Sequence, residues 1–267
     1  MSGIKEISSR DNERLREARR VRDGKQLDKI FVEGTRLVEE AVRSDTRIDC
    51  LFVTKGGLAR AAELIDLAGA RDVYQLSDSA FQSISDTVTS QGVALLAERP
   101  TTARPSLERR LKIASVPLVV FLYQINNPSN LGAVIRTVEA AGAAGVIVST
   151  RSADAFSPKA VRAAMGSSFR LPIWSDVDLG DGLVWAERNR LGIVAADTAA
   201  TKSYSQIDWK APRMVVIGSE AHGLPETERR KVSDLISIPI EESVESLNLA
   251  VACGVILFEA RRQNISS

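Results

Sequence analysis

The chain has 267 residues, 44% hydrophobic and 26% charged, which is typical of folded protein and long enough for two modest domains. Its N-terminus lacks the apolar core of a signal peptide, and no stretch approaches the roughly 20 apolar residues that span a bilayer, so we expect a cytoplasmic protein with no membrane partner. The formal net charge of +1 gives no global attraction to nucleic acid, so such a partner would have to bind local clusters of charge.

The sequence is poor in metal ligands and in reactive thiols. His222 is the single histidine, and Cys50 and Cys253 lie far apart in apolar runs. These residues cannot build a histidine-rich or an all-cysteine zinc site, although a carboxylate-only magnesium site stays open. We therefore predict two buried thiols and no metal site.

The N-terminal part begins with a basic helix and continues as alternating strands and helices. Residues 10–22 carry arginines and glutamates at helical spacing, which fits a solvated surface helix as well as a contact surface. From Ile30 to Glu98, apolar runs such as IFVEG, IDCLFVT and GVALLAE alternate with helix-like stretches. This alternation predicts a small α/β domain.

A polar, basic, proline-containing segment, RPTTARPSLERRLKIASVP, follows at residues 99–117. Such a composition is typical of a linker between compact units. We place the boundary near residue 105, which gives a first domain of residues 1–104 and a second domain of residues 105–267. The linker between their compact parts extends to about residue 115.

The C-terminal part contains the apolar runs PLVVFLY, GVIVST, GIVAAD, MVVIGSE and LISIPI, with a helix beginning near Leu131. Continuous apolar runs of this kind suit strands buried on both faces, as in a parallel sheet. Because ligands of open parallel sheets bind beyond the carboxyl ends of the strands, the polar residues that follow each run are the informative ones.

Three segments stand out at such places: NNPSNLGAVIRT at 126–137, GSEAHGLP at 218–225, and IPIEESVESLN at 238–248. Taken one at a time, a helix N-cap or a strand-to-helix turn explains each of them almost as well as a ligand site. The second is no phosphate-binding P-loop, because Leu224 and Pro225 follow Gly223 where that motif has lysine and serine or threonine. The absence of GxGxxG counts against a Rossmann-type enzyme.

In this order, each after an apolar strand, the three segments resemble the motifs of the SpoU/TrmH family of RNA 2′-O-methyltransferases. The resemblance covers residues 116–262, and FVEGTRLVEEAV and SDTVTSQGVALLA resemble the family's N-terminal substrate-binding domain. It implies a C-terminal parallel-sheet SPOUT domain with a deep trefoil knot, preceded by a smaller α/β RNA-binding domain. It also implies S-adenosylmethionine as cofactor, and a homodimer with the final helix at its interface.

Carried over by position, the family motifs imply two overlapping sets of residues. The cofactor pocket would be lined by Gly218, Ile238 and Leu247, with Glu220 and Asn248 close by. The reaction centre would contain Asn130, Arg136, Glu220, Ser246 and Asn248. Asn127 departs from the aspartate that many relatives carry, yet asparagine also caps turns.

The resemblance makes Arg136 the residue that activates the ribose hydroxyl. A guanidinium is effectively always protonated and is a poor general base, so we expect Arg136 to hydrogen-bond the developing 2′-oxyanion or its neighbouring phosphate. Asn130 and Ser246 would orient the ribose.

The expected partner is folded RNA, ribosomal RNA first and transfer RNA second, recognised by shape and by unpaired nucleotides. The candidate RNA contacts are Arg10, Arg14, Arg20, Arg36 and Gln91. The alternative is an RNA-binding protein that keeps the fold without methylating. Antibiotic self-resistance through a ribosomal site would use the same chemistry on another target.

Overall fold

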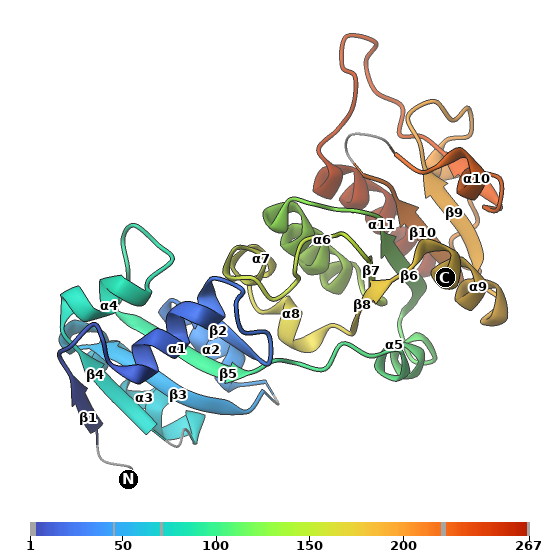
Figure 1. Cartoon of the computed structure of the whole chain (residues 1–267). Helices are drawn as coiled ribbons and strands as arrows, with labels where there is room; N and C mark the ends of the chain where they lie inside the picture. The colour runs from blue at the N-terminus through green and yellow to red at the C-terminus, as the bar shows by residue number, and fades with distance from the viewer. Residues whose placement is uncertain (1–3, 45, 70–71, 220–222, 266–267) are drawn as a thin grey trace. The chain divides into compact units, whose positions relative to one another are not determined.

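The computed structural model describes residues 4–44, 46–69, 72–219 and 223–265 (Figure 1). The chain forms two compact units, the first from residues 1–101 and 156–170, the second from 102–155 and 171–267. Composition along the sequence does not signal that 156–170 groups with the first unit. Within the described ranges, no helix is both long enough and apolar enough to cross a bilayer.

The first unit is built on a mixed sheet of five strands in the order β1-β4-β3-β5-β2. β1 pairs with β4 and β4 with β3 in parallel, whereas β5 runs antiparallel to β3 and β2. The predicted α/β domain is therefore confirmed. Its strands are β1 (Ile4–Ile7), β2 (Lys29–Glu33), β3 (Ile48–Thr54), β4 (Asp72–Leu76) and β5 (Val93–Glu98).

Helices cover both faces of this sheet. The predicted basic helix is observed as α1, whose buried face of Leu15, Ala18 and Val21 joins one core cluster with Phe81 and Ile84 of α4. Helix α1 packs against α4, and α2 packs against α3. The helices are α1 (Glu13–Arg22), α2 (Thr35–Val42), α3 (Lys55–Ala68) and α4 (Asp78–Ile84), and α7 (Pro158–Ala164) and α8 (Ser167–Arg170) are grouped with this unit.

The second unit is built on a sheet of six parallel strands in the order β11-β9-β10-β6-β7-β8. Five of them contain the predicted apolar runs, whereas β8 was not predicted. All seven residues of β7 are buried, as expected of a strand covered on both faces. The strands are β6 (Val116–Leu122), β7 (Ala143–Ser149), β8 (Ile173–Val177), β9 (Gly192–Ala196), β10 (Arg213–Ile217) and β11 (Asp234–Ile236).

The helices of the second unit are α5 (Arg104–Leu111), α6 (Pro128–Ala141), α9 (Leu179–Arg188), the 3-10 turn η1 (Tyr204–Gln206), α10 (Glu226–Arg229) and α11 (Leu249–Ile265). The segment interpreted as a linker thus contains α5. Its Leu107 is fully buried in the core with Phe121 and Leu183, and its Leu111 packs against the same core, so a short basic helix is docked by the burial of apolar side chains. The strand expected from LISIPI shortens to β11, since the backbone of Ser237 instead donates to Lys202 O.

The two cysteines lie in the cores, as predicted. Cys50 is buried in β3 of the first sheet and Cys253 in α11. Burial raises the pKa of both thiols to about 12, so neither carries appreciable thiolate near neutral pH. Both therefore act as small apolar side chains.

Candidate functional site

A cavity of about 440 Å³ lies in the second unit beyond the ends of β9, β10 and β11. Segments far apart in sequence meet there, including Ala196–Thr198 after β9, Ile217–Ser219 after β10 and Ile236–Ile238 after β11. Leu249, Ala252 and Ile256 of α11 complete its wall. The informative residues of the parallel sheet therefore do collect at its carboxyl edge.

Four of the predicted site residues line this cavity: Gly218, Ile238, Ser246 and Leu247. The backbone at Gly218 is tightly enclosed, because a Cβ built there would lie 2.6 Å from the carbonyl carbon of Gly223. Gly223 N donates to Ser219 O at 2.9 Å and closes the turn. This close approach of two backbone segments explains the glycines on either side of the loop.

Asn130 and Asn248 also meet, although 118 residues separate them. Asn248 Nδ2 donates to Asn130 Oδ1 at 3.3 Å, while Asn248 Oδ1 accepts from Ala250 N at 2.9 Å and caps α11. Asn127 Oδ1 caps α6 by accepting from Ser129 N at 2.9 Å. Both helix starts are thus fixed by asparagine side chains.

Arg136 does not reach the cavity of its own chain. It is exposed on α6 and is not among the cavity-lining residues. Six residues along an α-helix rotate the side-chain direction by about 240°, so Arg136 points to a different side of α6 than Asn130. Within one chain, Arg136 is therefore not part of the cavity wall. Glu220 lies outside the described residues.

Two charged residues of the cavity wall escaped sequence analysis. Asp197 follows β9 directly, and its Oδ2 lies 2.8 Å from Arg229 Nη2 of α10. Asp197 and Arg229 are the two charged residues among the described residues that line the cavity. The apolar run GIVAAD ends in Asp197, so the expectation that functional residues follow the strands could have identified this aspartate. No feature of the neighbouring sequence singles out Arg229.

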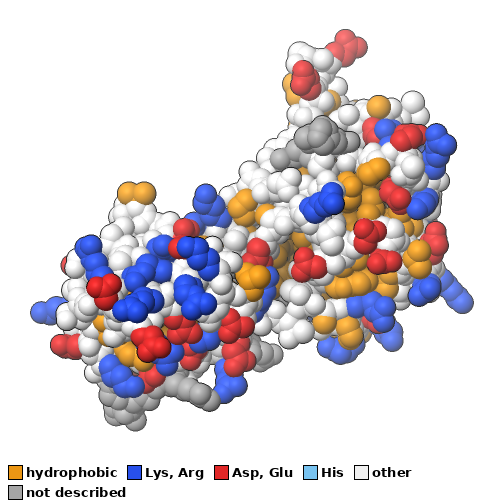
Figure 2. All heavy atoms as spheres, viewed as in Figure 1, with side chains coloured by type: hydrophobic (Ala, Val, Ile, Leu, Met, Phe, Trp, Pro, Cys, Tyr) orange, Lys and Arg blue, Asp and Glu red, His pale blue; other side chains and the backbone are white. Residues whose placement is uncertain are grey.

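The candidate RNA-contact residues of the first unit fall into two classes. Arg10, Arg20 and Arg36 are exposed. Gln91 is exposed as well, and its Oε1 accepts from Thr35 N at 2.8 Å. Figure 2 shows Lys and Arg side chains gathered on the visible face of this unit, interspersed with carboxylates.

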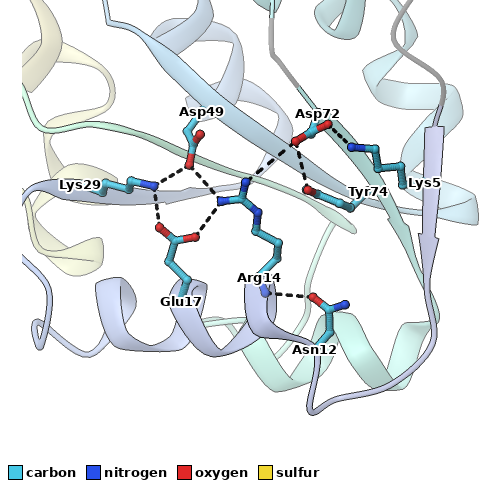
Figure 3. A network of polar contacts seen from close by, with 8 residues as sticks. All are labelled: Lys5, Asn12, Arg14, Glu17, Lys29, Asp49, Asp72 and Tyr74. Carbon is cyan, nitrogen blue, oxygen red and sulfur yellow. Dashed lines mark hydrogen bonds and ion pairs between the residues drawn. The ribbon is translucent and has the colours of Figure 1, made fainter.

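Arg14 is instead held in a polar network between α1 and the strands of the first sheet (Figure 3). Its Nη1 lies 3.0 Å from Glu17 and 3.7 Å from Asp49, and its Nη2 lies 3.9 Å from Asp72. Partial burial disfavours the charged form of Arg14, but hydrogen bonds, first with Glu17, outweigh it and raise the pKa of Arg14. This placement favours a structural role for Arg14.

Comparison with known proteins identifies the family. The model of the SpoU rRNA Methylase family matches residues 117–258, and that of the MRM3-like substrate binding domain matches residues 4–95. The chain belongs to the SpoU rRNA methylase family. The cavity described above lies within the part that this family model matches.

Full-length relatives agree with this assignment. An uncharacterised tRNA/rRNA methyltransferase of Synechocystis is 31% identical over 98% of this chain and 95% of the relative. The 23S rRNA (guanosine(2553)-2′-O)-methyltransferase RlmP of Bacillus subtilis is 28% identical over 97% of this chain and 100% of its own length.

Solved structures of methyltransferases resemble nearly the whole chain. The SpoU methyltransferase AviRb of Streptomyces viridochromogenes superposes with a TM-score of 0.84 at 27% identity, covering 96% of this chain and 98% of AviRb. The AdoMet-bound rRNA methyltransferase of Sinorhizobium meliloti gives a TM-score of 0.82 at 30% identity, with 97% and 98% covered. The α/β fold expected from the resemblance is thereby confirmed.

Proposed function

We propose that this SpoU methylase transfers the methyl group of S-adenosylmethionine to a ribose 2′-hydroxyl of structured RNA, with ribosomal RNA as the first candidate and transfer RNA as the second. The observation that carries the proposal is the cavity at the strand ends. Its wall combines residues of the second and third motifs, Gly218, Ile238 and Leu247, and the next residue, Asn248, is bonded to Asn130 of the first. RlmP and the Sinorhizobium enzyme, similar over nearly the whole chain, are named as rRNA methyltransferases.

The cavity fits the cofactor in size and chemistry. Its volume of about 440 Å³ lies within the range of roughly 300–1,000 Å³ usual for small-molecule sites. Apolar side chains such as Ile217, Ile238 and Leu249 suit the faces of a purine, and the backbone beyond the strand ends offers polar groups to its edge. When bound, the cofactor supplies an activated methyl group on a sulfonium.

The residues of the chain would then hold and activate the acceptor. Asn130 and Ser246 orient the ribose, since they lie on segments that meet beside the cavity. Arg136 donates hydrogen bonds to the oxygen on which negative charge develops, or to its neighbouring phosphate. Glu220, outside the described residues, stays a predicted member of this site.

Since Arg136 is exposed on α6, we infer that it serves the cavity of a second subunit in a homodimer. α6 packs against α11, and Val251, Phe258 and Ile265 of α11 are between 50 and 58% exposed and recur every seventh residue, as along one face of a helix. Such a face is apolar enough to bury against its symmetry mate. We further infer that the segment from Gly218 to Asn248 threads back as a deep trefoil knot, consistent with β11 lying beside β9.

Replacing Phe258 with glutamate should turn the dimer into a monomer, because two charges would face each other across the symmetric contact. Sedimentation velocity measures the change in mass. Val184, 43% exposed on α9, provides the matched control, since Val184→Glu alters an exposed apolar residue elsewhere and should leave the mass unchanged. A dimer that persists in Phe258→Glu contradicts this interface.

The first unit is proposed to hold the RNA through its exposed cations. Replacing both Arg20 and Arg36 with glutamine should weaken RNA binding and reduce the slope of log K against log salt by roughly two. Arg14→Gln is the matched control: it should lower the melting temperature and leave the slope unchanged, because Arg14 is already paired with Glu17. An unchanged slope in the double variant would contradict the proposal that Arg20 and Arg36 contact the RNA.

The direct test incubates the protein with labelled S-adenosylmethionine and separate pools of unmodified ribosomal and transfer RNA. We expect label in RNA, foremost in the ribosomal pool. RNA that is bound by the protein but acquires no label would favour the alternative, a non-catalytic RNA-binding protein on the same fold.

A further inference from the structure

The Asp197–Arg229 pair lies in the wall of the cavity that we propose for the cofactor. The side chain of Asp197 is 17% exposed and that of Arg229 is 31% exposed, so both are partly withdrawn from water. An ion pair of this kind at the end of a strand would suffice to fasten α10 to the sheet. Its position among the lining residues gives it a second use.

The carboxylate of Asp197 has acceptor capacity to spare. Its Oδ2 takes Arg229 and its Oδ1 accepts from Ala199 N at 2.8 Å. An ionised carboxylate offers about four lone-pair sites, so two remain beyond the contacts with Arg229 and Ala199. The backbone N–H of Asp197 donates to Ile236 O at 2.8 Å and fixes the residue beside β11.

Arg229, in contrast, is already shared between two carboxylates. Besides Asp197, its Nε lies 3.8 Å from Glu226 Oε2. The pair therefore offers the cavity an acceptor that the guanidinium keeps oriented. Ligand groups that donate hydrogen bonds, rather than a second carboxylate, fit this arrangement.

The charged pair lies on the far side of β10 from the Asn130–Asn248 contact. The strand order is β9-β10-β6, Asp197 follows β9, and Asn130 lies in α6, the helix after β6. Two strand spacings amount to about 10 Å. Asp197 therefore lies away from the Asn130–Asn248 contact, beside which we place the acceptor ribose.

We propose that Asp197 recognises the ribose diol of the cofactor, accepting hydrogen bonds from both adjacent hydroxyls, with Arg229 as the residue that positions it. An acidic side chain beyond a parallel strand is suited to this task, because two neighbouring O–H donors match the two oxygens of one carboxylate. The inference depends on the proposed cofactor site and adds a recognition residue that none of the three motifs contains.

Calorimetric binding to the intact protein tests the assignment with three ligands: S-adenosylhomocysteine, 5′-methylthioadenosine, which lacks the amino-acid tail, and the 2′,3′-dideoxy analogue of the latter. Asp197→Asn should weaken the first two by about ten- to a hundredfold and leave the dideoxy analogue bound as by the native protein. Asp181→Asn, an exposed change on α9, is the matched control and should alter none of them.

Three results would overturn the proposal. If Asp197→Asn binds S-adenosylhomocysteine with native affinity, Asp197 does not contact the ligand. A loss confined to S-adenosylhomocysteine assigns Asp197 to the amino-acid tail, and an equal loss for the dideoxy analogue assigns it to the adenine. Because these readouts measure binding alone, they are separate from the question of whether RNA is methylated on ribose.

Discussion

Replacing Arg136 with alanine should lower methyl transfer to RNA by at least about a hundredfold, the usual cost of removing a donor to a developing oxyanion. Binding of S-adenosylhomocysteine should remain at the native level, because the role proposed for Arg136 is a contact with the acceptor oxygen or its phosphate and not with the cofactor. Single-turnover transfer and calorimetry measure the two properties separately. Arg136→Lys keeps the charge but loses the planar fork, so its activity should fall between those of the native protein and the alanine variant.

Arg136 also allows a test of whether each active site combines residues of two subunits. If Arg136 serves the partner's cavity, mixing Arg136→Ala subunits with Gly218→Val subunits creates heterodimers with one intact site. Random association should then restore up to about a quarter of native activity, since half the dimers are mixed and each has one working site of two. Normal turnover by Arg136→Ala alone, or no recovery on mixing, would contradict the proposed role.

Gly218→Val should abolish measurable cofactor binding, and Gly218→Ala should weaken it by about ten- to a hundredfold. The physical reason is the distance of 2.6 Å between a Cβ at Gly218 and the carbonyl carbon of Gly223, which only a backbone shift can relieve. That shift would deform the cavity, which both glycines line. Calorimetry with S-adenosylhomocysteine measures the loss.

Gly254→Ala provides the matched control in the same unit. A Cβ there meets Thr137 Cγ2 at an ordinary 3.6 Å, so neither binding nor melting temperature should fall. Native cofactor affinity in Gly218→Ala would show that the turn adapts freely and does not shape the site.

The end of the sheet at which the cavity lies could be expected from the sequence, because the carboxyl ends of parallel strands meet at one end of the sheet. Gly218, Ile238 and Leu247 were implied by the family resemblance, and in the structure they line the cavity. Asp197 obeyed the same rule and was missed because it belongs to none of the three motifs.

Other features depend on partners that the sequence pattern does not reveal. Arg14 and Arg20 belong to the same predicted basic helix, yet Arg14 pairs with Asp49 and Asp72 on strands more than thirty residues away, and Arg20 is exposed. Arg136 lies six residues beyond Asn130 on α6, and the helical rotation of about 240° between them directs the two side chains to different sides of the helix. Tertiary pairing and helix orientation decide such cases.

The most direct measurement of the central claim is alkaline hydrolysis of RNA labelled by this protein from S-adenosylmethionine. A ribose 2′-O-methyl group removes the nucleophile that cleaves the adjacent phosphodiester, so the label should appear in alkali-resistant dinucleotides. Label released as mononucleotides would place the methyl group on a base and contradict the account.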